Sequence, residues 1–167
     1  MAGRDIGDGA IAGAITGFII GVAAILLSLL GLGALTKYFD IRQVFGGLLP
    51  AVGGATLTIS AMLTILVFLI IVGLVLGAIF GWIYEHIPTT SAITKGIVFM
   101  LGFWVIFGLL LPIIVGTGTR EVTAGITAAS ILTSLIAAII WGALLGWVFT
   151  WIAKRAAVPG RAPVVRP

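Results

Sequence analysis

The chain has 167 residues, of which 61% are hydrophobic and 8% are charged, and its net charge at pH 7 is +4. A soluble domain carries roughly 25% charged residues, so this composition excludes a soluble globular protein and predicts a chain surrounded by lipid. The nine basic residues are scattered along the sequence. They give no reason to expect a nucleic-acid partner, and membrane lipids are the expected partners.

Residues with thiol or amide side chains are almost absent. The chain has no cysteine and no asparagine, and Gln43 is its only glutamine. The missing cysteine excludes disulfides, thiolate metal sites and cysteine nucleophiles. Hyperthermophile proteins shed thermolabile residues of this kind, but membrane spans avoid polar amides as well. A thermophilic source is therefore one of two explanations.

The first apolar stretch predicts a transmembrane helix over about residues 9–32. Asp8 precedes it and is the expected N-cap. The stretch is longer than the core of a signal peptide and lacks a cleavage site, so we expect a retained helix. Glycines recur at every fourth position and form one smooth face, which predicts close packing against another helix in the same chain or in a second copy. These are Gly9, Gly13, Gly17 and Gly21.

The segment from about residue 36 to residue 54 is not predicted to span the membrane. It starts with a polar stretch, 36–43, and continues as an apolar stretch that glycines and Pro50 interrupt. The apolar part is too short to cross a bilayer. We expect an interfacial or half-inserted segment here.

Three further apolar stretches predict spans over about residues 56–84, 91–115 and 120–153. Pro88 stops the first of them, Ser91 is the expected N-cap of the next, and basic residues at the end of the last suit the helix dipole. Residues 1–155 are therefore predicted to form a single all-α domain, a four-transmembrane-helix bundle. Residues 156–167 are predicted to be a flexible, basic, proline-rich tail.

The placement of basic residues predicts the orientation of the bundle. With four spans both termini lie on one side, and the positive-inside rule predicts a cell-membrane protein with both termini in the cytoplasm. The cytoplasmic side then carries Arg4, Lys95, Lys154, Arg155, Arg161 and Arg166, and the other side carries Lys37, Arg42 and Arg120.

The sequence also resembles itself, which predicts an internal two-helix duplication. Three blocks recur in the same order: residues 34–37 with 92–95, 45–50 with 107–112, and 77–84 with 142–149. Each match alone is weak in such an apolar sequence. Three matches in order, including glycine, proline and tryptophan positions, favour duplication.

The last of these blocks carries two stripes of small residues at equal expected depth. The stripes are Gly73, Gly77 and Gly81 on the second span, and Ala138, Gly142 and Gly146 on the fourth. They are expected to meet each other, or to receive the first or third span. Aromatic residues at the same ends predict an interfacial belt that anchors the helices: Trp82, Tyr84, Trp147 and Trp151.

Small polar residues form a face on each of the same two spans. They are Thr56, Ser60 and Thr64 on the second span, and Thr123, Thr127, Ser130 and Ser134 on the fourth. Such faces serve helix packing through hydrogen bonds, which is the favoured interpretation. They could also line a pore or polar seam.

Candidate chemistry is scarce. No acidic or basic residue lies in the middle of a predicted span, which argues against a proton pump or an ion-coupled carrier. His86 is the single histidine, so one chain cannot supply bis-histidine haem ligation or a histidine-rich metal site. No catalytic motif is present. We expect no enzyme, no metal and no cofactor.

Several features together resemble a known group. The glycine-rich first span, the third span from Lys95 through Trp104 to Pro112, and the Gly-x-x-x-Gly ends of the second and fourth spans are similar to the uncharacterised YagU-like four-helix inner-membrane proteins of bacteria and archaea. Members of that group carry a histidine early in the second and fourth spans, and this chain has none there. The resemblance implies a four-helix membrane fold and brings no established activity.

Two functions fit these observations. The first is a small non-catalytic accessory or structural subunit, in a homo-oligomer or in a larger membrane complex such as a respiratory or other energy-converting assembly, packed through Gly-x-x-x-Gly faces. The alternative is a channel or facilitator for a small neutral solute, lined by the serine and threonine faces of the second and fourth spans. An envelope or virion membrane protein is a third class that no feature of the sequence discriminates.

Overall fold

A computed structural model of the chain describes residues 2–44, 59–111, 114 and 128–156. Its long helices are α1 (Ala2–Leu29), α4 (Ile59–Ile83), α5 (Ala92–Phe103) and α8 (Ala128–Ala156), and α5 continues into the π-helix η2 (Trp104–Leu110). Short helices are α2 (Gly33–Thr36), α3 (Ile41–Val44) and η1 (Tyr84–His86). Among the described residues, four helices are long and apolar enough to cross a membrane. The chain is therefore an all-α, multi-pass membrane protein.

The ends of the helices depart from the predicted ones in two places. The N-cap prediction for Asp8 is wrong, because α1 begins at Ala2 and Asp8 lies inside the helix. The prediction took the onset of apolar sequence as the start of the helix, whereas a helix can continue through polar residues outside the hydrocarbon. Ser91 does occupy the N-cap position of α5, but its side chain makes no capping hydrogen bond. The predicted starts of the second and fourth spans, at residues 56 and 120, lie outside the described residues.

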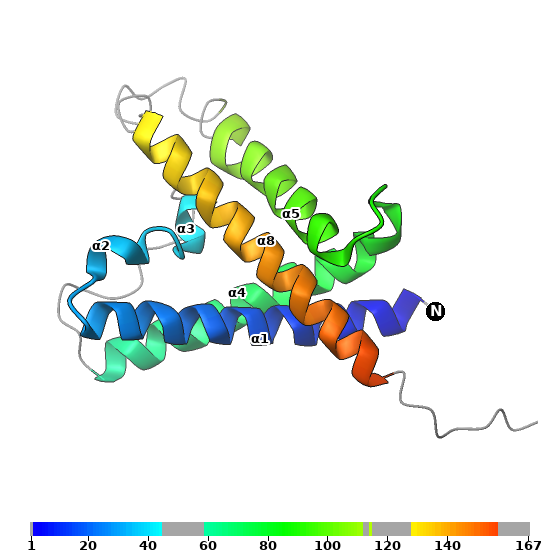
Figure 1. The fold of residues 1–167 in the computed structure, drawn as a ribbon, viewed down its shortest axis with the longest axis horizontal. Helices are drawn as coiled ribbons and strands as arrows, with labels where there is room; N and C mark the ends of the chain where they lie inside the picture. The colour runs from blue at the N-terminus through cyan, green and yellow to red at the C-terminus, as the bar shows by residue number, and fades with distance from the viewer. Residues whose placement is uncertain (1, 45–58, 112–113, 115–127, 157–167) are drawn as a thin grey trace, which may run out of the picture.

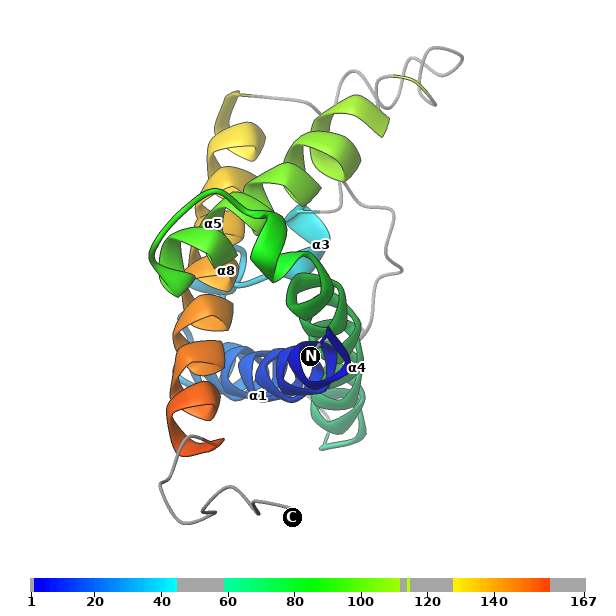
Figure 2. The same ribbon diagram turned by 90° about the vertical axis from the view of Figure 1, so that its right-hand side faces the viewer.

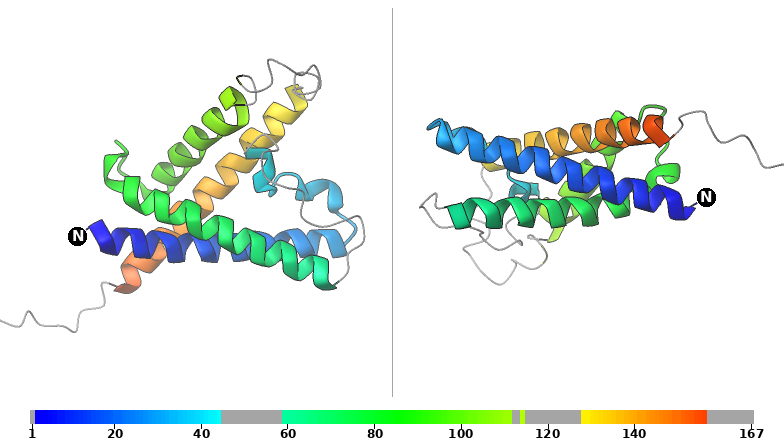
Figure 3. Two further views of the ribbon diagram at one scale, coloured as in Figure 1. Left: turned by 180° about the vertical axis from the view of Figure 1, so that it is seen from behind. Right: turned by 90° about the horizontal axis from the view of Figure 1, so that it is seen from below.

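The long helices form two antiparallel pairs (Figure 1). α1 packs along α4, and α5 packs along α8, while α8 also crosses α1 and joins the pairs. Viewed along α1, α4 lies on one side of α1, α8 runs past its other side, and α5 lies above (Figure 2). The view from behind shows the two pairs at an angle, with α2 and α3 between them at one end (Figure 3).

An aromatic cluster joins the pairs at the end where α4 finishes and α5 begins. The ring of Phe80 lies 5.4 Å from those of Phe99 and Phe149, and Tyr84 lies 4.6 Å from Phe149. Lys95 donates a hydrogen bond of 2.8 Å to the carbonyl oxygen of Tyr84 and lies 4.3 Å from the centre of its ring. These contacts fix the end of the first pair to the start of the second.

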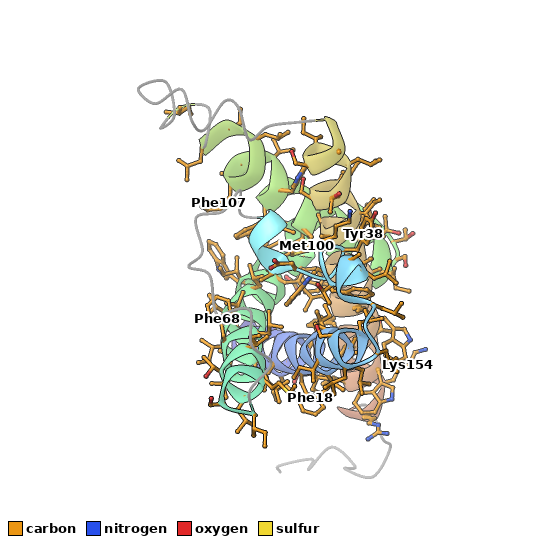
Figure 4. All side chains as sticks on the ribbon, turned by 90° about the vertical axis from the view of Figure 1, so that its left-hand side faces the viewer. Phe18, Tyr38, Phe68, Met100, Phe107 and Lys154 are labelled. Carbon is orange, nitrogen blue, oxygen red and sulfur yellow. The ribbon has the colours of Figure 1, made fainter. Side chains whose placement is uncertain are left out.

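The interior and the outer face of the molecule differ as expected for a protein in lipid. Met100 lies at the centre and is completely buried, whereas Phe18 projects from the outer face of α1 and is 49% exposed (Figure 4). Large apolar side chains cover the outside of every long helix. Water would disfavour such a surface, but hydrocarbon accommodates it.

The described part of the predicted interfacial segment enters the bundle. α1 ends at Leu29, Gly31 with a φ of +74° turns the chain back, and α2 and α3 follow. Ile41 and Val44 are completely buried, because α3 packs against α8 and η2. The packing of α3 favours half-inserted over interfacial for residues 36–44, and the depth of this segment in the membrane stays a prediction. Residues 45–54 lie outside the described part of the chain.

Candidate functional site

The α1–α4 contact is made by backbone against backbone. A methyl group added at Gly13 would overlap the carbonyl oxygen of Gly73 and lie 2.8 Å from the Cα of Gly77, and one at Gly9 would lie 2.9 Å from the Cα of Gly81. Gly17 faces the backbone of Leu69 in the same way. Since no side chain fits between the helices, the glycine register of α1 sets how closely they approach. Gly21 ends the row against Leu66.

The α5–α8 pair also has backbone-to-backbone contact, in one short stretch. Added methyl groups at Gly96 and Gly142 would each overlap the backbone of the other helix, and Gly146 faces the backbone of Ala92 and Ile93. Gly77 and Gly81 thus receive α1 as Gly142 and Gly146 receive α5. In this comparison Gly9 of α1 corresponds to Gly96 of α5. The repeated sequence blocks give a different correspondence, because they align residues 34–37 with residues 92–95. The duplication stays a prediction.

These contacts decide where the predicted packing glycines lie. All of them are buried between helices of one chain: Gly9, Gly13, Gly17, Gly21, Gly73, Gly77, Gly81, Gly142 and Gly146. The glycine stripes of the second and fourth spans each receive a neighbouring helix and do not meet each other. Of the two alternatives, packing within the chain is the one that the structure has, and association with a second copy or another subunit stays a prediction.

The predicted polar seam between the second and fourth spans does not form among the described residues. Ser60 and Thr64 are exposed on the outer face of α4, and the Thr64 hydroxyl donates to the Ser60 carbonyl oxygen at 2.8 Å. On α8, Ser134 is buried and accepts a 2.8 Å hydrogen bond from Trp104 Nε1. Hydropathy alone could not predict that one of these faces is exposed and the other buried, since both consist of small, mildly polar residues. Thr56, Thr123 and Thr127 lie outside the described residues, and Ser130 is half-buried.

Three of the four predicted interfacial anchors are exposed, and the fourth packs inside the bundle. Trp82, Trp147 and Trp151 are exposed at 65%, 53% and 41%, and Arg155 lies 3.7 Å above the ring of Trp151. Their outward position suits an interfacial belt. Tyr84 differs, because its ring packs inward in the aromatic cluster. The other two tryptophans, Trp104 and Trp141, are buried and donate hydrogen bonds inside the bundle.

Trp141 holds the half-inserted segment. Its indole Nε1 donates a 2.9 Å hydrogen bond to the carbonyl oxygen of Phe39, and Trp141 lies near the middle of the apolar stretch Ala129–Arg155 of α8. Non-helical backbone at membrane depth requires such partners. The bond therefore brings Phe39 and its neighbour Asp40 beside the middle of a span. Sequence analysis did not single out Asp40, because it is one of several polar residues in the stretch 36–43 and belongs to no motif.

Next to Asp40 the bundle is hollow. A cavity of about 140 Å³, open to the outside on one side, lies between the end of α1, the α2–α3 segment and the start of α4. Its polar lining residues are Ser28, Thr36 and Asp40. Its apolar lining residues are Ala24, Ile25, Phe39, Met62, Ile65, Phe68 and Leu69. Within the described parts of the chain, no group of three or more histidine, cysteine or acidic side chains could hold a metal ion.

A family model matches residues 7–159, and its description is a family of unknown function, DUF6789. The chain belongs to this family. No curated protein and no solved structure matches it.

For this DUF6789 member the match covers all four spans, the half-inserted segment and the cavity. The family carries no stated activity, so function rests on the geometry alone. The match gives no support to the YagU-like resemblance, which stays a prediction.

Proposed function

We propose that the protein is a non-catalytic accessory subunit that associates with another membrane protein, or with a second copy, through the outer face of α4. The observation that carries this proposal is the position of Ser60 and Thr64. Both side chains face outward near the start of a span, where small polar residues suit the close approach of a partner helix. The glycine faces are already covered within the chain, so the association surface moves from glycine to this face.

Co-purification tests the proposal. The tagged chain is extracted from its native membranes in mild detergent, and its size and co-purifying proteins are measured. We expect a complex larger than one chain. The double variant Ser60→Leu, Thr64→Leu should dissociate it, because the larger side chains keep the partner helix away from α4. Leu74→Ile is the matched control, because Leu74 is exposed further along the same helix. A monomer without a partner, or a complex that the double variant leaves intact, contradicts the proposal.

The proposed orientation, with both termini in the cytoplasm, follows from the distribution of basic residues. Reporter fusions after Arg155 test it. Green fluorescent protein should fluoresce there and alkaline phosphatase should stay inactive. The reverse result contradicts the orientation and leaves the α4 association surface untouched, since that surface does not depend on the direction of insertion.

A further inference from the structure

The outer face of α8 carries two tryptophans and then two cations at its C-terminal end. Trp147, Trp151 and Arg155 follow one another at intervals of four residues, which places them on one face of the helix. The guanidinium carbon of Arg155 lies 3.7 Å from the centre of the Trp151 ring. Lys154, in the same last turn, is exposed and projects from the bundle (Figure 4). The end of α8 therefore presents positive charge beside an aromatic surface.

The two cations are available to an anion. Within the described parts of the chain, no aspartate or glutamate pairs with Lys154 or Arg155, and both side chains are exposed. The ring of Trp151 attracts the charge of Arg155 through its π face. This contact does not use the N–H donors of the guanidinium, whose geometry matches that of a phosphate. The ring thus positions Arg155 and leaves its donors free.

The order of side chains along this face follows the order of groups in a phospholipid. Ile139 is aliphatic and 39% exposed, the two tryptophans follow, and the cations come last. At about 1.5 Å per residue, Ile139 and Arg155 are about 24 Å apart along the helix. This distance is close to half of the roughly 40–45 Å thickness of a bilayer with its headgroups. Tryptophans favour the level between acyl chains and headgroups, which places the cations at the level of the phosphate.

A tryptophan on α4 lies at the same end of the bundle but beside the opposite charge. Trp82 is 65% exposed, and the contact between Tyr84 and Phe149 shows that α4 and α8 finish at the same end. Glu85 and His86 follow Trp82, and they carry a net negative charge when the histidine is neutral. An anionic headgroup is repelled there. The face of α4 at Trp82 is therefore an internal control for the face of α8.

We propose that the face of α8 from Ile139 to Arg155 is a binding site for an anionic phospholipid. Its phosphate pairs with Arg155 and Lys154, and its acyl chains lie along Trp147 and Trp151. A zwitterionic phospholipid has the same phosphate but adds a positive group to it, which the two cations repel. The site is separate from the association surface on α4, so it does not depend on the proposed partner.

Quenching of tryptophan fluorescence by brominated lipid tests the site at the face itself. The full chain is reconstituted into phosphatidylcholine vesicles that contain increasing fractions of phosphatidylglycerol or phosphatidylcholine brominated on the acyl chains. One variant, Trp82→Phe with Trp151→Phe, keeps Trp147 as its exposed tryptophan. The other, Trp147→Phe with Trp151→Phe, keeps Trp82. Trp104 and Trp141 are buried in both variants, and phenylalanine at position 151 still offers a ring to the guanidinium.

At Trp147, the binding constant of phosphatidylglycerol relative to phosphatidylcholine should be on the order of tenfold or more, since each cation near the surface contributes about fivefold. At Trp82 we expect no preference. Arg155→Gln should lower the preference at Trp147 about fivefold. Lys37→Gln is the matched control, because Lys37 is also an exposed cation beside a ring, that of Tyr38, and its loss should leave the preference unchanged.

Three results overturn the proposal. Equal quenching of Trp147 by the two lipids would mean that the cations serve only the helix dipole. A preference that Arg155→Gln leaves unchanged would mean that another group attracts the lipid. An equal preference at Trp82 would mean that the anionic lipid gathers around the whole bundle. The substituted side chains Trp82, Trp147, Trp151, Arg155 and Lys37 are all exposed, so the variants should fold as the natural chain does.

Discussion

The α1–α4 and α5–α8 pairs solve the same packing problem in two ways. Three glycines on α1 keep the first pair in backbone contact from Gly9 to Gly17, and Gly21 faces the side chain of Leu66. The second pair has one such glycine on α5, Gly96, and is then held by side chains, with Trp104 bonded to Ser134. Where the glycines stop, the second pair makes room for α3, which packs on both α8 and η2.

The difference shows what a glycine register decides. A regular row of glycines holds one face of a helix against one partner over the length of the row, and nothing else enters that part of the interface. A single glycine contact fixes only one end of a pair, and the other end is free to receive a third element. The π-helix η2 occurs at that other end, where Gly108 faces the carbonyl oxygen of Val44. π-helical turns are frequent at functional positions, and this one faces the half-inserted segment.

The largest predicted effect comes from Gly13→Ala in the first pair. The added methyl group overlaps the carbonyl oxygen of Gly73 and lies 2.8 Å from the Cα of Gly77, and neither backbone atom can move without opening the neighbouring glycine contacts. We expect a loss of about 3 kcal/mol in the free energy of unfolding, measured by SDS titration in mixed micelles with circular dichroism. Gly7→Ala is the control, since no atom lies within 4 Å of its added methyl group. Equal stability of the two variants would contradict the backbone contact.

A smaller effect is predicted for Gly142→Ala in the second pair. Its methyl group would lie 2.6 Å from the Cα of Ile97, but α5 has one packed glycine and can shift as a unit. The same titration should give a loss of about 1–2 kcal/mol, less than for Gly13→Ala. The opposite order would show that the second pair is the more tightly constrained.

The smallest effects concern the Trp104–Ser134 hydrogen bond. Ser134→Ala leaves the buried indole N–H without its partner, whereas Trp104→Phe removes the donor and leaves the Ser134 hydroxyl its bond to the carbonyl oxygen of Ile131. We expect losses of about 1 kcal/mol for Ser134→Ala and about 0.6 kcal/mol or less from the hydrogen bond in Trp104→Phe. Trp147→Phe, at a 53% exposed position, controls for the loss of indole. Additive effects in the double variant would mean that the bond contributes nothing.

The sequence predicts the spans and the close packing of glycines because both depend on local patterns. Hydropathy identifies apolar stretches, and the interval of four residues from Gly9 to Gly21 predicts a helix face. The choice of partner is not local. Glycine stripes on α4 and α8 are equally suitable for α1, and only the folded chain shows that Gly73, Gly77 and Gly81 receive it.

The position of the cavity was also beyond sequence analysis. Residues 36–43 are polar and were predicted to belong to an interfacial or half-inserted segment. Their backbone is held by Trp141, 102 residues further along the chain from Phe39. No periodicity in either segment indicates such a bond. The same bond brings Asp40 into the bundle, which weakens the argument that the chain has no ionisable residue at membrane depth.

The central claim is that α4 of the same chain covers the glycine face of α1. Cysteines at positions 21 and 66 test it directly, because the added Cβ of Gly21 would lie 3.6 Å from the Cα of Leu66, which suits a disulfide. Phe18→Cys with Leu66→Cys is the control, since Phe18 lies on the exposed face of α1.

The measurement is mass spectrometry of oxidised, digested protein from a mixture of unlabelled and ¹⁵N-labelled chains. We predict that Gly21→Cys with Leu66→Cys gives linked peptides that are wholly light or wholly heavy, and that the control pair gives none of these. Linked peptides that combine one light and one heavy segment would place α4 of another copy on the glycine face, and would contradict the account.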